Sequence, residues 1–540
     1  MKSLLAVICL LLAVQTIIAA EPEPRFSADA IRAHVSFLAD DLLEGRETGS
    51  RGYDIAAHYV AAQFTQYGLK PAGVDGSWFI PVNFQVRTIA DGSAVTVIGP
   101  KGEQRWDNGS DVIVSASANF KDQDVEAGLV FVGYGIDEKR VGIDDYRGLD
   151  VRGKIVVVLG GYPKGMDSEI GAYLGNVKDE VAARHGAIGM IGIDTDQSER
   201  VSPWAKRVET LHNKGMTWLG PDGKAESDKP AVWGGVRLDR VAAEALFAGA
   251  PATLAQIRSE ADKDGGRPKG FALKTRIHIE RHSEWSQLSS PEIAGMIEGS
   301  DPVLKNEYVV LMGHADHLGI DTRRSGDQIF NGALDNAAGV ATLLEVAHAF
   351  ATSTQKPRRS IIFFASTGEE KGLLGADFFA HHPTVPIKKI VGLVDLDMPI
   401  LLYDFIDVTA FGAGHSTMGR IVQRAAAKMN VALAPDPLPE EGIFTRSDHY
   451  MFVQRGVPAI MLATGFGNGG EQQWREFLDQ RYHQPSDDLS QPILWDAGAK
   501  FAHLNYLITS EMANADERPL WLQGDFFGDV FAPGQPRAPR

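Results

Sequence analysis

The residues best suited to chemistry form an ordered series of metal-binding side chains between residues 314 and 483. Two are imidazoles and three are carboxylates, a mixed nitrogen and oxygen set that suits zinc. A further carboxylate, Glu369, directly precedes one of them. A spare carboxylate beside metal ions is what metal-assisted hydrolysis needs as a general base. The five candidate ligands are His314, Asp335, Glu370, Asp397 and His483.

Four of these six residues follow apolar runs that have the character of strands. Between the runs lie helical patterns, and this alternation indicates a parallel or mixed sheet with helices on both faces. Open sheets of this kind place their sites at the carboxyl ends of their strands. Three separate segments are therefore predicted to deliver metal-binding residues to one rim. The runs are 308–312, 361–365 and 390–394, and the residues after them are His314, Glu369 with Glu370, and Asp397.

The other two candidates carry less weight when each is considered alone. Asp335 lies at the start of the helical pattern around Val340, where helix amides hold a carboxylate and the ordinary role is that of an N-cap. His483 lies in a loop, where a histidine is more often a surface residue than a ligand. Their assignment as ligands depends on the whole series.

Six short motifs occur in order along this part of the chain: GHADHLG, NGALDNAAG, TGEEKGLLG, DLDM, RSDHYMF and YHQPSD. Together they resemble the motifs of the co-catalytic di-zinc aminopeptidases of peptidase family M28, which share their fold with glutamate carboxypeptidases. Because the motifs are distinct and correctly ordered, the resemblance is specific.

The resemblance implies a role for each candidate ligand. Asp335 would bridge two zinc ions. His314 and Asp397 would complete the first site. Glu370 and His483 would complete the second. The expected cofactor is therefore Zn²⁺, with two ions per chain.

The resemblance also implies the catalytic residues. Glu369 would be the general base that activates a metal-bridged hydroxide, and Asp316 would orient His314. Tyr482 matches a tyrosine that donates to the developing oxyanion, with Arg446 as an assisting residue. A cis peptide bond is expected between Asp335 and Asn336.

The sequence departs from the family pattern at a few places. Asp395 stands where asparagine is usual, and Pro399 stands where a small flexible residue is more usual. His317 and His449 match neighbours of the family ligands rather than the ligands themselves.

The resemblance also implies a domain organisation. Residues 26–90 and 281–515 would form the zinc peptidase domain, a mixed central β-sheet sandwiched by helices. Residues 91–280, with the pieces FVGYGI, DDYRGLDVRGKIVVV and HGAIGMI, resemble an inserted, β-rich protease-associated domain. Within it, the polar stretch 195–230 is expected to be a long loop. Residues 516–540 would form a C-terminal tail, whose Pro-rich end, residues 532–540, is expected to be disordered.

Composition and the amino terminus bound the location and partners. The formal net charge of −17 argues against binding to a phosphate backbone, so no nucleic-acid partner is expected. Residues 1–20 have Lys2, an apolar run and small residues at the end, which is typical of a secretory signal cleaved near Ala20. A secreted or periplasmic protein without stable membrane insertion is expected; retention of the segment as an anchor is the alternative. The only cysteine, Cys9, lies in this run.

Three functions remain open at this point. The first is an exported aminopeptidase acting on peptides, the second a carboxypeptidase or dipeptidase on the same metal core. An acidic group near the free amine of the substrate would favour the first, and an arginine cluster the second. The third is a metal-free binding protein on the same scaffold, which the full set of ligands disfavours. The sequence does not indicate the oligomeric state.

Overall fold

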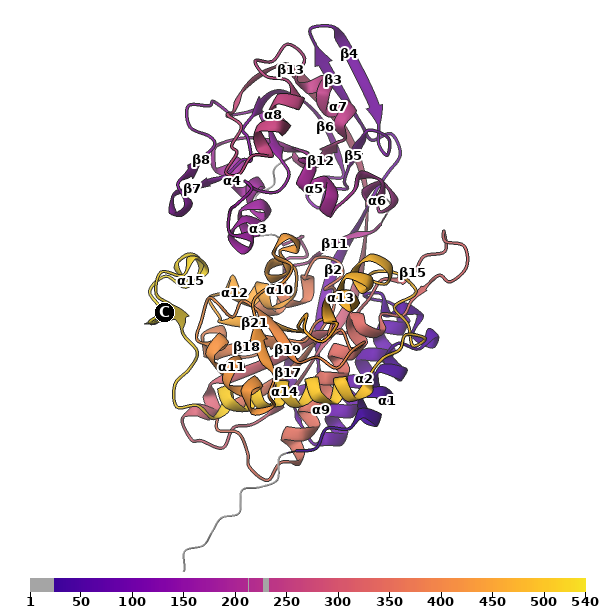
Figure 1. The fold of residues 1–540 in the computed structure, drawn as a ribbon. Coiled ribbons are helices and arrows are strands. Elements are labelled where there is room, and N and C mark those ends of the chain that lie inside the picture. Colours follow the sequence, from indigo (N-terminus) through magenta and orange to yellow (C-terminus); the bar gives the residue numbers. More distant parts are fainter. Residues whose placement is uncertain (1–23, 212, 227–232) are drawn as a thin grey trace, which may run out of the picture.

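The computed structural model describes residues 24–211, 213–226 and 233–540. It has two bodies, a lower and an upper one, joined by a pair of long strands (Figure 1). The predicted signal segment, residues 1–20, lies outside the described residues. Among the described residues, no helix is long and apolar enough to cross a membrane.

The lower body is built around a mixed sheet, which confirms the predicted fold class. Its four central strands run parallel to one another, and strands at both sides run antiparallel to them. In spatial order the strands are the end of β13 (Phe271–Ile297), then β17 (Ser360–Ser366), β14 (Tyr308–His314), β18 (Ile390–Asp395), β21 (Ala459–Thr464), β19 (Asp407–Phe411) and β20 (Ala432–Ala434). The four central strands are buried, except for the half-buried Tyr308 at the start of β14, as their continuous apolar sequences predict.

Helices cover this sheet. Ser27 caps the first helix by accepting a hydrogen bond from the Ala30 amide, and the buried residues Ile31, Val35 and Leu38 recur at helical spacing. A group of four helices packs together against β13 and β14: α1 (Ala28–Leu38), α2 (Arg51–Tyr67), α9 (Ala338–Thr352) and α14 (Trp495–Asn514). A separate layer is formed by α10 (Leu374–His381) and by α12 (His449–Val453), which packs on β18 and β21. Beside α14 lies α11 (Met418–Lys428).

A two-stranded ribbon joins the bodies. Strand β2 (Phe79–Ile89) pairs antiparallel with residues 283–293 of β13, and the two strands are seen rising from the lower to the upper body in Figure 1. On its other edge β2 pairs with β11 (Gly215–Trp218). The expectation of a long loop over residues 195–230 is therefore wrong. That stretch contains β11 and two short helices, α5 (Asp196–Val201) and α6 (Trp204–Glu209), whose few apolar residues gave little periodicity to detect.

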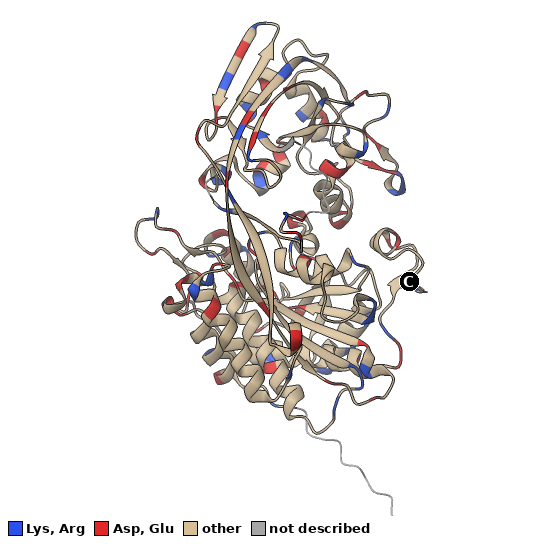
Figure 2. Ribbon diagram, turned by 180° about the vertical axis from the view of Figure 1, so that it is seen from behind, with Lys and Arg blue, Asp and Glu red and all other residues tan. Residues whose placement is uncertain are grey.

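The upper body has a sheet of its own. Four of its strands are also parallel, and the first half of β13 is antiparallel to its neighbours. The spatial order is β4 (Gly102–Asp107), β3 (Ala94–Gly99), β13, β6 (Asp122–Phe131), β9 (Ile155–Leu159), β10 (Gly189–Ile193), β12 (Trp233–Leu238) and β5 (Val112–Val114). The helices around it include α3 (Ser168–Asn176), α4 (Lys178–Arg184), α7 (Arg240–Leu246) and α8 (Leu254–Ala261). Acidic and basic residues are interspersed over both bodies (Figure 2).

The C-terminal segment, residues 516–540, is ordered, including the Pro-rich end 532–540 that is expected from its composition to be disordered. It forms β22 (Trp521–Leu522), α15 (Phe526–Phe531) and β23 (Arg537–Ala538). Trp521 is buried and donates its indole N–H to the Gly456 carbonyl at 3.0 Å. Trp521 and Phe527 are buried in the core of the lower body, and this burial outweighs the proline content that suggested disorder.

Candidate metal centre

The carboxyl ends of the central strands carry the candidate residues to one rim. Strand β14 ends at His314, which pairs in register with Ser366 at the end of β17. On the other side of β14, Met312 is in register with Asp395 at the end of β18. Because these strands are parallel neighbours, the residues that follow them lie on the same edge of the sheet. The structure thus brings the segments of Glu369 and Asp397 to His314.

One cluster forms around His314, which is buried. Its Nε2 lies 3.3 Å from Asp335 Oδ1 and 3.3 Å from Asp397 Oδ1. Glu369 Oε2 lies 3.9 Å from the same nitrogen. Three predicted ligands and the predicted base therefore converge on one point.

A second cluster shares Asp335 with the first. His483 Nε2 lies 3.4 Å from Asp335 Oδ2 and 3.1 Å from Glu370 Oε2. His317, placed by the sequence among the neighbours of the ligands, has its Nδ1 2.6 Å from Glu370 Oε1. One oxygen of Asp335 thus faces each cluster, as expected for a bridging carboxylate.

The donor set fits divalent cations. In each of two groups, His314 with Asp335 and Asp397, and His317 with Asp335 and Glu370, candidate ligand atoms lie within 4.8 Å of one another. Gathering this many carboxylates in a buried place is unfavourable unless positive charge compensates them. Imidazole and carboxylate donors are the usual zinc ligands outside thiolate sites.

The pKa values of the clustered residues are shifted by the same crowding of carboxylates. Burial, with the charges of Asp397 and Glu370, raises the pKa of Glu369 well above its ordinary value. Burial also acts to raise the pKa of Glu370, but the charges of His483 and His317 outweigh it and hold this pKa well below its ordinary value. Burial lowers the pKa of His483, yet Glu370 and Asp335 raise it to about 10. A proton on the His483 imidazole therefore compensates part of the carboxylate charge.

The Asp316 side chain contacts the backbone of Glu369 and Glu370 rather than the ring of His314. Its carboxylate oxygens accept hydrogen bonds from the backbone amides of Glu369 at 3.3 Å and Glu370 at 3.4 Å, and from the Thr48 hydroxyl at 2.9 Å. His314 Nδ1 is 3.9 Å from the nearest carboxylate oxygen of Asp316 but 3.1 Å from its carbonyl oxygen. The prediction that the Asp316 side chain orients His314 differs from this geometry, because the main chain of Asp316 makes that contact.

Several supporting residues were not identified from the sequence. The buried Asp487 carboxylate accepts hydrogen bonds from the amides of Leu334 and Asp335, each at 3.0 Å to one oxygen. The Ser447 hydroxyl lies 2.7 Å from Asp397 Oδ2 and 2.8 Å from Asp395 Oδ2. Both belong to recognised motifs, YHQPSD and RSDHYMF, and their place in those motifs was the available signal.

A buried arginine supports the loop before Asp335. Arg46 donates to the carbonyls of Ala315 at 3.1 Å, Asn331 at 2.6 Å and Gly332 at 3.1 Å. Burial lowers its pKa to about 10, against the opposing charges of Asp316 and Asp335. Its partners are far from it in sequence, so local patterns gave no indication of this contact. The peptide bond between Asp335 and Asn336 is cis, as expected.

Tyr482 and Arg446 differ in their relation to the site. The Tyr482 ring stacks on the His483 ring with 3.8 Å between centroids. Burial, and the charge of Asp335, raise the pKa of its phenol well above the ordinary value, so the hydroxyl keeps its proton. Arg446 is instead bound to Glu441, with Nη1 3.0 Å from Oε2. The structure places Tyr482 beside the clusters and holds Arg446 in an ion pair.

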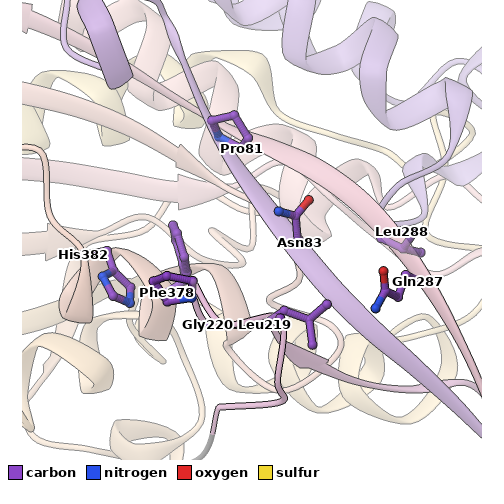
Figure 3. A pocket seen from close by; sticks show the side chains of 10 residues that line it. Pro81, Asn83, Leu219, Gly220, Gln287, Leu288, Phe378 and His382 are labelled. Atoms are coloured by element: carbon purple, nitrogen blue, oxygen red, sulfur yellow. The ribbon is translucent and has the colours of Figure 1, made fainter.

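One sizeable cavity lies away from these clusters. It has a volume of about 730 Å³ and lies where the ribbon meets α10. Figure 3 shows Pro81 and Asn83 on β2, with Phe378 and His382 from α10 and its end. The six residues predicted as ligands and base do not line it.

Comparison with known proteins supports a peptidase site in the lower body. Residues 292–508 match the family model described as Peptidase family M28. This match covers most of the lower body. Below, the lower body is called the M28 domain.

Two aminopeptidases from other organisms match parts of this domain. The chain is 26% identical over 212 residues to "Aminopeptidase NAALADL1" of Mus musculus, covering 38% of this chain and 25% of the relative. It is 30% identical over 174 residues to "Aminopeptidase Y" of Saccharomyces cerevisiae, covering 31% of this chain and 30% of the relative. The matches thus span less than a third of these relatives' lengths.

A solved structure extends the comparison to both bodies. The "Aminopeptidase from Aneurinibacillus sp. strain AM-1" aligns over 92% of this chain and 96% of its own, with a TM-score of 0.52 and 20% identity. At this identity the likeness concerns the fold. The M28 domain and the upper body together therefore have a known arrangement.

Proposed function

We propose that the chain is an exported zinc-dependent exopeptidase, and specifically an aminopeptidase that removes N-terminal residues from peptides. The observation that carries the proposal is the Asp335 carboxylate, whose two oxygens face two separate His–carboxylate clusters. In this assignment His314 and Asp397 hold one zinc ion with Asp335. Glu370 and His483 hold the second.

Each residue has a defined task in the proposed reaction. Bound zinc ions would polarise the scissile carbonyl and lower the pKa of the attacking water. Glu369 accepts the proton of this water and later donates it to the leaving amine. Burial raises the pKa of Glu369, which favours retention of the proton until the amine leaves. The protonated Tyr482 hydroxyl donates to the oxyanion as it develops.

The charges beside the site favour the aminopeptidase over the carboxypeptidase. Lys371, which follows the ligand Glu370, has its Nζ 3.2 Å from Glu47 Oε1. Arg446 is paired with Glu441. Because a carboxylate already neutralises each of these cations, they are weak receptors for a substrate's C-terminal carboxylate.

Substrates with one blocked end would test the assignment. The reagents are amino-acid p-nitroanilides, N-acetylated peptides and C-amidated peptides, with and without a chelator. The aminopeptidase is expected to cleave anilides and amidated peptides, to spare acetylated peptides and to stop when metal is removed. Cleavage of acetylated peptides that have a free C-terminus would instead establish a carboxypeptidase. Absence of bound zinc by mass spectrometry, together with no cleavage, would support a metal-free binding protein.

The proposal extends to location and domain organisation. Export rests on residues 1–20, which read as a signal, and sequencing of the mature N-terminus tests it by locating cleavage near Ala20. We further propose that residues 91–280 are a protease-associated domain inserted in the peptidase domain of residues 26–90 and 281–515. Limited proteolysis that releases the inserted part intact would support those boundaries.

A further inference from the structure

A histidine outside the metal clusters joins three parts of the chain. His415 lies between β19 and α11, with Nε2 2.8 Å from Glu169 Oε2 and Nδ1 2.6 Å from Asp525 Oδ2. Glu169 belongs to α3 of the upper body, and Asp525 caps α15 in the C-terminal segment. One imidazole thus connects the M28 domain, the upper body and the C-terminal segment.

Aromatic rings enclose this connection. The His415 ring lies 4.9 Å from the Phe444 ring and 4.8 Å from the Phe527 ring, between centroids. Tyr173 of α3 packs against Phe526 at 5.7 Å and Phe527 at 6.0 Å. Shielding from water strengthens the charge interactions between the imidazole and its two carboxylates.

The connection reaches the turn before Ser447. Helix α3 packs against this turn, and the position of a Cβ at Gly442 would be 3.2 Å from Ala172 Cβ. In the same turn Phe444 contacts His415, and Ser447 follows three residues later. The Ser447 hydroxyl contacts Asp397 at 2.7 Å. A continuous path of contacts therefore runs from His415 to a candidate zinc ligand.

We propose that His415 is a positioning residue, which fastens α3 and the C-terminal segment to the turn that holds Ser447 against Asp397. The inference rests on the proposed function only in taking Asp397 as a metal ligand. In this arrangement the upper body and the C-terminal segment contribute to metal binding without touching the metal.

The charges around His415 give the connection a pH dependence. Glu169 faces it from α3 and Asp525 from the C-terminal segment, while Asp436 and Glu440 of the preceding turn act on the same group of charges. Burial lowers the pKa of His415, but Asp525 and Glu169 raise it to about 9. Since this folded-state pKa exceeds the ordinary value of 6.5, the stabilisation is complete below pH 6.5 and is lost as the pH rises through about 9.

Substitution of His415 with a matched control tests the proposal. The variants, all made in the full chain, are His415→Gln, Glu169→Gln and the double variant that carries both changes. The control is His185→Gln, which breaks a histidine–carboxylate contact of 2.9 Å with Asp137 inside the upper body. The readouts are zinc affinity by chelator competition, hydrogen exchange of residues 442–447, and kcat and KM. Glu169→Gln leaves the contact of His415 with Asp525 in place, and so serves if His415→Gln does not fold.

We expect His415→Gln to weaken zinc binding by roughly 10-fold, as loss of support behind a ligand usually does. Exchange in residues 442–447 should accelerate, kcat should fall with KM little changed, and the control should retain wild-type values. The double variant should be no worse than His415→Gln alone, because both changes break one connection. A lower melting temperature with wild-type zinc affinity and exchange would overturn the proposal. A protein that binds zinc but cleaves no peptide would refute the proposed function, while zinc affinity and exchange would still decide the role of His415.

Discussion

The two bodies both contain parallel strands, but the charged residues at the carboxyl ends of these strands are arranged differently. Each contains four parallel strands whose carboxyl ends share an edge. In the M28 domain, carboxylates from separate segments converge on that edge. In the upper body, Lys178 instead donates to the carbonyls of Leu159 at 2.6 Å and Gly161 at 2.5 Å, and Asp194 pairs with Arg207 at 2.6 Å. Carboxylates that converge on one place need a cation to compensate their charge. Charged groups at the upper edge are already paired with their neighbours and need none.

Removal of the proposed base should give the largest effect. Glu369→Gln is expected to lower kcat by about 10²- to 10⁴-fold, the usual contribution of a general base, while zinc content stays unchanged. Steady-state kinetics and metal analysis measure both quantities. The matched change at the upper edge, Asp194→Asn, should leave kcat unaltered. Near-normal turnover in Glu369→Gln would remove this residue from the mechanism.

Zinc removal should destabilise the M28 domain selectively. Without cations the carboxylates repel one another, so we expect a lower melting temperature in chelator than with zinc. At a zinc concentration 100 times the dissociation constant, binding contributes about 2.7 kcal/mol, which corresponds to roughly 5 °C for a domain of this size. Differential scanning calorimetry with hydrogen exchange would assign the change to a body. Identical melting curves in the two conditions would contradict the assignment of a metal site.

Asp487 should have a smaller, metal-specific effect. Its carboxylate fixes the backbone amides of Leu334 and Asp335. Asp487→Asn loses one acceptor and is expected to weaken zinc affinity about 10-fold. Asp407→Asn is a suitable control, because Asp407 also accepts from a backbone amide in the M28 domain, that of Gly467 at 2.9 Å. Equal zinc affinities in the two variants would show that the support of Asp335 does not depend on this charge.

The difference between the bodies also explains what the sequence could predict. The continuous apolar runs of β14, β17 and β18 predicted a sheet with buried strands, and the ordered motifs located the rim. Residues 195–230 were predicted less well, because β11 is defined by its pairing with β2 rather than by a pattern of its own. Order in residues 532–540 was missed for the same reason, since β23 is defined by its pairing with β22.

Within the site, residue types were easier to predict than their contacts. The five candidate ligands follow from the motifs, but the contact of His317 with Glu370 and the role of the Asp316 main chain depend on side-chain directions. Arg46 joins segments that are 269 to 286 residues apart. Such long-range polar contacts leave no periodicity in the sequence, and three-dimensional structure is needed to find them.

The smallest effect is expected at the upper edge itself. Burial lowers the pKa of Lys178 from its ordinary value of 10.5 to about 7, so between these values the unfolded chain binds more protons and stability rises with pH. Relative to Lys178→Met, the wild-type protein should gain about 1 kcal/mol between pH 7 and pH 8. Urea denaturation at the two pH values measures this difference. Zinc affinity and kcat should stay within about twofold of wild type, because a locally paired group at this edge has no part in the chemistry. A loss of turnover like that of Glu369→Gln would mean that the upper edge is catalytic too, and the contrast between convergent and locally paired charge would fail.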